Sequence, residues 1–179
     1  MLDVQDGKAL LISKYALDCK PYNTSDTYIT WELCTRRHWL NNDFINFSFP
    51  VGEKEKISRV VVPADENSDY KFRIDSGNST QDKVFLLSIN EADKYFKLNE
   101  KYCKPTNFAI SNGAIKSDND NCGWWLRTPG FNEYGFAFGV EFQTCAATVE
   151  SDGNINKKGV ICSIEINTVR PALWVDLIS

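Results

Sequence analysis

The sequence predicts an α+β domain in which a mainly antiparallel sheet from the C-terminal third packs against helices from the first two thirds. Helical periodicity is concentrated before residue 113, whereas from Cys122 onward the apolar runs are typical of strands. The 179 residues have the length of one folding unit. We therefore expect residues 1–179 to form a single domain.

Four helices are expected in the first two thirds of the chain. The longest covers residues 30–44, where Leu33, Arg37, Leu40 and Phe44 recur with helical spacing and Thr30 is a suitable N-cap. The shorter helices are expected at residues 50–57, at residues 89–96 after the Ser88/Glu91 capping box, and at residues 106–112 before Gly113.

Strands are expected at both ends of the chain. Asp6-Gly7 predicts a hairpin between residues 2–4 and 8–13, and Asp152-Gly153 predicts a second hairpin near the C-terminus. The other expected strands cover residues 59–62, 83–88, 123–127, 136–142, 146–150, 160–167 and 171–177.

Composition excludes several classes of function. The formal charge is −4 and the pI is about 5.1, which argues against binding to nucleic acid because that needs clustered Lys and Arg. No apolar run reaches the length of a membrane span. The first residues include acids and have no apolar core of a signal peptide, so a cytoplasmic location is expected.

Six cysteines are scattered along the chain without any C-x-x-C pair. A disulfide framework is typical of smaller secreted domains, and zinc sites need closely spaced ligands. Free cysteine is among the most frequently buried residue types. We therefore expect six free and mostly buried thiols.

Three strings of residues carry a family resemblance: 124–130 (Trp-Trp-Leu-Arg-Thr-Pro-Gly), Ala146-Ala147-x-Val149, and 169–174 (Val-Arg-Pro-Ala-Leu-Trp). With the upstream strings at residues 15–23, 30–41 and 80–88, they resemble a large bacterial family of unknown function. That family is similar to the C-type-lectin-like fold, in the branch of formylglycine-generating enzymes and of variable proteins from diversity-generating retroelements. The resemblance implies a C-type-lectin-like α+β fold.

Two departures from the family pattern accompany this resemblance. Family members normally begin with further strands, which are missing before Asp3. Their segment between the Pro-Gly and Ala-Ala strings is also shorter than residues 131–145, which are rich in aromatic side chains. The resemblance implies that this segment and the following hairpin form an exposed face.

The expected function is a non-catalytic recognition module for a protein or glycan ligand, with residues 131–145 and the 153–163 hairpin as its contact face. Aromatic, Asn and Glu side chains combine rigid contact area with adaptable hydrogen bonding. A second copy of the chain is another candidate partner. The expected ligand-binding residues are Phe131, Asn132, Glu133, Tyr134, Asn154, Asn156, Lys157 and Lys158. Trp124, Trp125, Arg127 and Arg170 favour structural roles instead.

The alternative function is an enzyme that uses a cysteine thiolate. Cys34 lies four residues before His38, the only histidine, so a helix would place them on one face. No third orienting group is evident, and a structural pair is the competing interpretation.

No cofactor is expected, although a structural calcium ion is an open alternative. Residues 118–123 begin like a calcium loop, but Cys122 and Pro129 occupy positions that need oxygen ligands. Loops rich in Asp and Asn are more often turns. The other candidate loop contains Asp65, Asp69, Asp75, Asn78 and Asp82.

Overall fold

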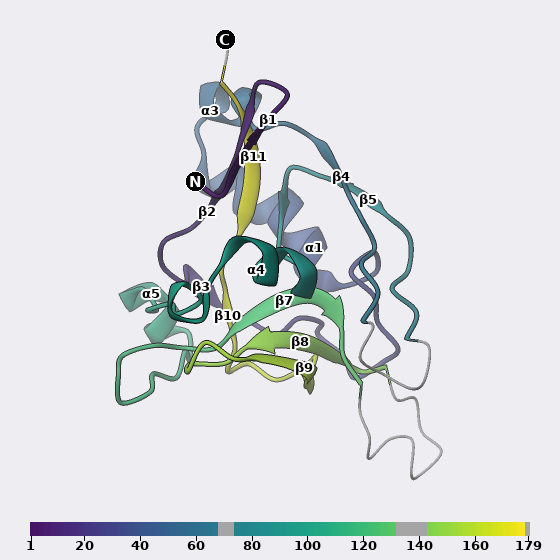
Figure 1. Cartoon of the computed structure of the whole chain (residues 1–179), viewed down its shortest axis with the longest axis vertical. Coiled ribbons are helices and arrows are strands. Elements are labelled where there is room, and N and C mark those ends of the chain that lie inside the picture. The colour runs from purple at the N-terminus through teal and green to yellow at the C-terminus, as the bar shows by residue number, and fades with distance from the viewer. Residues whose placement is uncertain (68–73, 132–142, 178–179) are drawn as a thin grey trace.

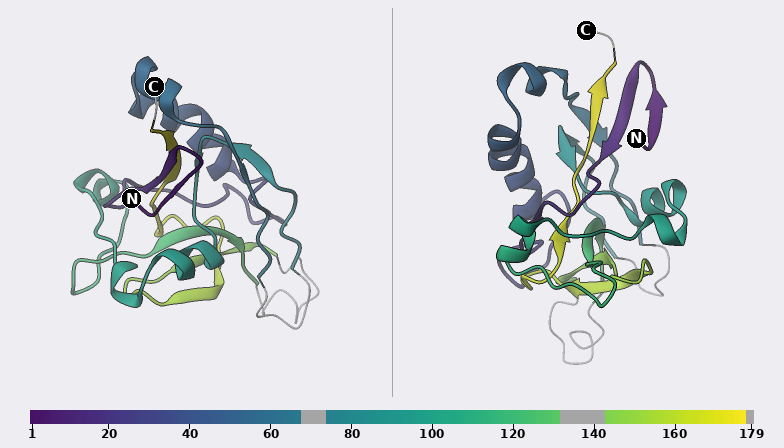
Figure 2. Two further views of the ribbon diagram at one scale, coloured as in Figure 1. Left: turned by 45° about the horizontal axis from the view of Figure 1, so that its top comes forward. Right: turned by 90° about the vertical axis from the view of Figure 1, so that its left-hand side faces the viewer.

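The computed structural model describes residues 1–67, 74–131 and 143–177. Two main sheets lie at opposite ends of the molecule, with helices beside and between them (Figures 1 and 2). Buried side chains from all parts of the chain form one main hydrophobic core. The mixed α+β class expected from the sequence is confirmed.

The first sheet has four strands in the order β1-β2-β11-β6, and its neighbouring strands are antiparallel. The strands are β1 (Asp3–Gln5), β2 (Lys8–Ile12), β6 (Val84–Phe85) and β11 (Ala172–Asp176). The β1–β2 turn contains Asp6 and Gly7 with φ of 48° and 71°, which confirms the predicted hairpin. The sheet thus pairs strands from the two ends of the chain.

The second sheet has five strands in the order β3-β10-β7-β8-β9 and is antiparallel except between β10 and β7. The strands are β3 (Asp18–Cys19), β7 (Trp124–Pro129), β8 (Cys145–Val149), β9 (Ile155–Ile161) and β10 (Thr168–Val169). A small ribbon of β4 (Val60–Val62) and β5 (Thr80–Asp82) completes the described strands. The strand expected at residues 136–142 lies outside the described residues.

One expectation about the sheets was wrong. The sequence predicted that residues 124–177 form a single sheet. Instead, β7 to β10 belong to the five-stranded sheet, and β11 belongs to the four-stranded one. The change occurs at Arg170-Pro171, directly between β10 and β11. Proline has no amide hydrogen for a sheet ladder, which favours a break in pairing at this point.

The predicted long helix starts later than expected. It begins at α1 (Thr35–Trp39), continues as a π-helical turn (Leu40–Phe44) and ends in α2 (Ile45–Ser48), while α3 (Val51–Lys56) follows Pro50. Cys34 is the N-cap instead of Thr30, because its sulfur accepts the Arg37 amide. Leu33 therefore lies before the helix and is 64% exposed, whereas Leu40 and Phe44 are buried as predicted.

The two helices predicted from capping signals are confirmed. In α4 (Ile89–Tyr95) the Ser88 hydroxyl accepts the Glu91 amide, and the Glu91 carboxylate accepts the Ser88 amide. In α5 (Asn107–Ser111) Thr106 is the N-cap, and Gly113 has a φ of 103° after the helix end. A 3₁₀ turn (Leu98–Glu100) connects the two helices.

Strand β7 carries three buried side chains that bond to the segments around it. Trp124 and Trp125 are fully buried, and their indole N–H groups donate to the carbonyls of Lys101 and Lys20 at 3.0 Å. Arg127, also buried, donates to the carbonyl of Leu86 and pairs with the Glu91 carboxylate. The expected structural role of these residues is confirmed.

Candidate functional site

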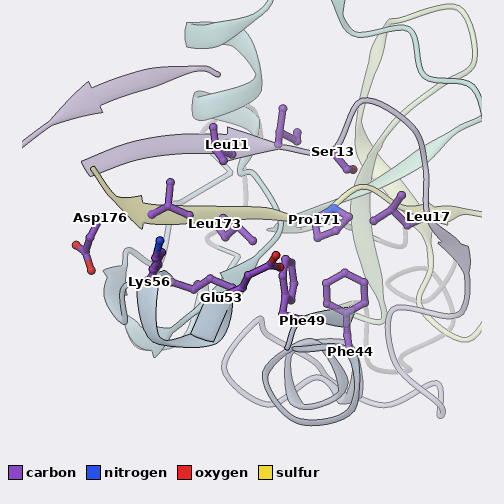
Figure 3. Close-up of a pocket in the computed structure, with 13 residues that line it drawn as sticks. Leu11, Ser13, Leu17, Phe44, Phe49, Glu53, Lys56, Pro171, Leu173 and Asp176 are labelled. Carbon is purple, nitrogen blue, oxygen red and sulfur yellow. The ribbon is translucent and has the colours of Figure 1, made fainter. Parts of the chain in front are cut away.

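An apolar pocket of about 460 Å³ lies between the four-stranded sheet, the π-helical turn with Phe49, and α3 (Figure 3). Ligand-binding pockets in proteins usually have volumes of about 300–1,000 Å³ and mostly apolar linings. The side chains that line it are Leu11, Ile12, Ser13, Leu17, Phe44, Phe49, Glu53, Lys56, Ile57, Pro171, Leu173, Val175 and Asp176. We refer to this cavity as the apolar pocket.

One wall of the apolar pocket is a face of the four-stranded sheet. Leu11 on β2 pairs directly with Leu173 on β11, and directly opposed residues of an antiparallel pair lie on the same face. Val175 lies on that face too, because side chains two residues apart on a strand point the same way. These three side chains are only half-buried, so the wall is incompletely covered.

The opposite wall comes from the helical segment. Phe44 ends the π-helical turn, and its ring packs edge-on against Phe49 with centroids 6.1 Å apart. Asn41 fixes this turn against β6: its side-chain oxygen accepts the Lys83 amide, and its nitrogen donates to the Val84 carbonyl, both at 2.8 Å. Local π-helical geometry often occurs at functional sites.

Few polar groups reach the apolar pocket. Lys56 and Asp176 lie at its α3 end, whereas the Glu53 side chain extends from α3 toward Phe49 (Figure 3). The Asp176 carboxylate accepts the Ser58 hydroxyl at 2.7 Å. Ser13 lies at the other end, and its buried hydroxyl has no hydrogen-bond partner among the described residues. A ligand with one polar group could satisfy this hydroxyl, since buried polar groups are normally hydrogen-bonded.

A second cavity of about 450 Å³ adjoins the apolar pocket and shares Leu17 and Phe44 with it. Phe47 and Phe108 also line it and are 90% and 61% exposed. Together the two cavities extend the apolar surface along α2. Surface of this kind is typical of sites that contact a partner.

The contact face expected from the sequence is described only in part. Asn132, Glu133 and Tyr134 lie outside the described residues, whereas Phe131 is buried and its amide donates to the Lys158 carbonyl at 2.7 Å. The structure therefore brings Phe131 and the hairpin together, with the Phe131 ring inside the protein.

The β8–β9 hairpin forms the outer edge of the five-stranded sheet. Asn154 is exposed, and its amide groups donate to the Asp152 carboxylate at 2.9 Å. Asn156 accepts the Gly159 amide, and the Lys157 carbonyl accepts the Asn67 side chain. Asn154 thus shapes the β8–β9 turn and Asn156 shapes the irregularity in β9, while the Lys158 side chain is exposed.

Cys34 and His38 line a third, polar cavity of about 390 Å³. His38 is exposed, but Cys34 is buried, and its thiol donates to the Trp31 carbonyl at 3.3 Å. Burial raises the pKa of the Cys34 thiol to about 11. A raised pKa lowers the thiolate fraction at neutral pH, which weakens the case for a nucleophile.

Two of the acids proposed as calcium ligands already have protein partners. Asp82 is fully buried and accepts from Trp31, Thr80 and Arg37, and Asp75 accepts the Tyr28 hydroxyl at 2.6 Å. Within residues 1–67, 74–131 and 143–177, no group of three His, Cys, Asp or Glu side chains is placed to hold a metal ion. Asp69 lies outside these ranges.

All six cysteines lie in the described part of the chain, and all are buried and free. The expectation of buried free thiols is confirmed. Burial also raises the pKa of the Cys19 and Cys145 thiols to about 11. Most of the thiols are therefore protonated at neutral pH.

Sequence reasoning missed the apolar pocket. The runs at residues 8–13 and 171–177 did indicate strands with apolar side chains on both faces. A strand of that kind needs other segments packed against both of its faces. No pattern in the neighbouring residues showed that β2 and β11 pair, or that one face of the pair is incompletely packed.

The fold and the pocket define a mixed α+β domain with a cavity of ligand size. The model of the family DUF6273, a domain of unknown function, matches residues 6–177, so the chain belongs to this family. No curated protein and no solved structure matches the chain. Among the described residues, no helix combines the length and apolar character needed to cross a membrane.

Proposed function

We propose that the chain is a non-catalytic recognition module whose ligand is a protein segment with an apolar side chain seated in the apolar pocket. The observation that carries this proposal is the cavity of about 460 Å³ between β2, β11 and the helices, with its apolar lining. Buried apolar anchors of one partner in pockets of the other supply most of the energy of many protein interfaces.

The chemistry of the lining favours a protein over a glycan. A sugar ring carries several hydroxyl groups, and each would lose hydrogen bonds to water on entering an apolar cavity. The polar groups of the described lining are few: Ser13, Glu53, Lys56 and Asp176, and Asp176 already accepts the Ser58 hydroxyl. An aliphatic or aromatic side chain loses no such bonds and gains the free energy of burial.

We also propose that the fold of this chain is related to the C-type-lectin-like fold. It is supported by the two sheets of the α+β fold and by the position of the β8–β9 hairpin at a sheet edge. Exposed Asn154 and Lys158 make this hairpin a second candidate contact face. Figure 1 shows it at the opposite end of the molecule from β1, β2 and α3, so the two faces can be tested separately.

A peptide library displayed on phage and an array of glycans, each applied to the purified protein, test the proposal. We expect enriched peptides that share an aliphatic or aromatic position. The substitution Leu173→Gln should weaken their binding tenfold or more, because it places an amide in the apolar pocket. Binding is measured by fluorescence anisotropy of the labelled peptide.

The matched control is Val61→Gln, which changes a 62% exposed apolar residue on β4, outside the described lining of the pocket. It should leave peptide affinity unchanged. If peptides bind equally well to the Leu173→Gln protein but lose affinity on Asn154→Ala and Lys158→Ala, the contact face is the hairpin. Binding to glycans with no enriched peptide would overturn the choice of ligand.

The thiolate alternative makes a separate prediction at Cys34. Because its pKa is about 11, the thiolate fraction at pH 7 is on the order of one in ten thousand. Alkylation of Cys34 by iodoacetamide in the folded protein should be slow and should accelerate about tenfold per pH unit below that pKa. Peptide mapping measures the rate, and rapid alkylation of Cys34 at pH 7 would revive the enzyme hypothesis.

A further inference from the structure

Two cysteines from separate loops meet in the core. The Cys122 amide donates to the Cys103 carbonyl at 2.8 Å, and the Cys122 thiol lies 3.4 Å from the same oxygen. In antiparallel sheets, opposed residues joined by backbone hydrogen bonds have Cα atoms about 5.5 Å apart. That separation falls inside the range of about 4.4–6.8 Å found in disulfides. The two thiols lie close enough for each to influence the pKa of the other.

A buried cation lies beside the pair. Arg170 is 6% exposed, and its guanidinium stacks on the rings of Phe96 and Trp124 at 5.0 and 5.1 Å. Its Nε donates to the Ser13 carbonyl, but its Nη1 has no hydrogen-bond partner within the described ranges. No carboxylate of those ranges pairs with it either. Buried charges are normally paired, so Arg170 favours an anion among its neighbours.

The two thiols differ in how easily they ionise. The neighbouring Cys103 thiol, together with Thr168 and Arg170, lowers the pKa of the Cys122 thiol against the effect of burial. The neighbouring Cys122 thiol and burial raise the pKa of the Cys103 thiol. Cys122 is therefore the partner that forms the thiolate, and the positive charge of Arg170 favours its ionised form.

We propose that Cys103 and Cys122 form a modification site at which a small peroxide closes a disulfide. The Cys122 thiolate attacks one oxygen of hydrogen peroxide, which gives a Cys122 sulfenic acid and releases hydroxide. The Cys103 thiol loses its proton and attacks the Cys122 sulfur, which expels the second hydroxide. The two protons neutralise the hydroxides, so two thiols and one peroxide yield one disulfide and two water molecules.

Hydrogen peroxide suits this site because it is a small molecule. Cys103 and Cys122 are only 2% and 1% exposed, so a bulky oxidant needs a larger opening of the fold than a molecule close to water in size. The disulfide bond would link the loop before α5 to the segment just before β7. It would thereby enclose α5 and the turn after it in one covalent loop.

The test uses the wild-type protein. After mild hydrogen peroxide treatment in the folded state, denaturation and alkylation should reveal four free thiols instead of six, and the mass of the untreated chain less two hydrogen atoms. Trypsin should release residues 102–116 and 117–127 as one linked peptide. The melting temperature should rise by roughly 5–10 °C, and a reductant should reverse the change.

Single variants distinguish this pair from the other cysteines. In Cys103→Ser the resolving thiol is gone, so Cys122 should accumulate as a sulfenic acid that dimedone labels. Cys145→Ser is the matched control and should still lose two thiols on treatment. Retention of all six thiols by the wild-type protein, or a disulfide that joins any other cysteines, would overturn the proposal.

Discussion

Replacing Arg127 with Leu is expected to lower the free energy of unfolding by about 3–5 kcal/mol. Arg127 is 1% exposed and pairs with both oxygens of Glu91 and with Asp65. Its guanidinium also donates to the carbonyls of Leu86 and Pro63 at 3.0 and 3.3 Å. Leucine would leave these acceptors without their donor inside the protein, which costs more than the lost attraction alone.

Urea unfolding followed by tryptophan fluorescence measures this effect. Arg127→Lys should fall between the wild type and Arg127→Leu, because an ammonium group keeps the charge but cannot form the two parallel bonds to Glu91. Arg59→Leu, at an exposed arginine, should change the stability by less than about 1 kcal/mol. An Arg127→Leu protein as stable as Arg59→Leu would show that the buried cluster contributes nothing net.

Replacing Asp82 with Ala is the second large change, with an expected loss of about 3–5 kcal/mol. The Asp82 carboxylate is fully buried and accepts the Trp31 indole at 3.0 Å, the Thr80 hydroxyl at 2.6 Å and the Arg37 guanidinium at 2.8 Å. Alanine removes all three acceptor contacts and leaves the donors unpaired. The loss should loosen the junction of α1 and β5.

Asp43→Ala, at an exposed acid of the π-helical turn, is the matched control and should change stability by less than about 1 kcal/mol. A double-mutant cycle with Arg37→Ala isolates the Arg37–Asp82 pair, since coupling is expected between residues in direct contact. A coupling energy near zero would show that Trp31 and Thr80, rather than Arg37, account for the effect of Asp82.

Signals that act within a few residues of the chain predicted local structure well. Ser88 with Glu91, Thr106 and Asp6-Gly7 each determine a backbone conformation through bonds or torsions of their immediate neighbours, and each prediction is confirmed. The predicted start of the long helix was wrong, because Thr30 is a preferred N-cap residue type and Cys34 is not, yet Cys34 is the N-cap. The choice of Cys34 is not visible in helical periodicity.

The apolar pocket could not be predicted for a different reason. Leu11 and Leu173 become neighbours only through the pairing of β2 with β11, and Phe44 reaches them only through the π-helical turn. Hydrophobic runs show that a strand has two apolar faces, but they do not show which segment covers each face. The chain also changes sheets between β10 and β11, at Pro171, and this change depends on the pairing of β11 with the distant strand β2.

The pairing of β2 with β11 also constrains when the protein can fold during its synthesis. A ribosome makes β1 and β2 long before their partner strand β11 leaves the exit tunnel. Contacts of such large sequence separation form slowly, because the ends of a long chain must first meet. Until then the inner edge of β2 stays open, and the nascent chain exposes an unpaired strand that a chaperone or a second nascent chain can occupy.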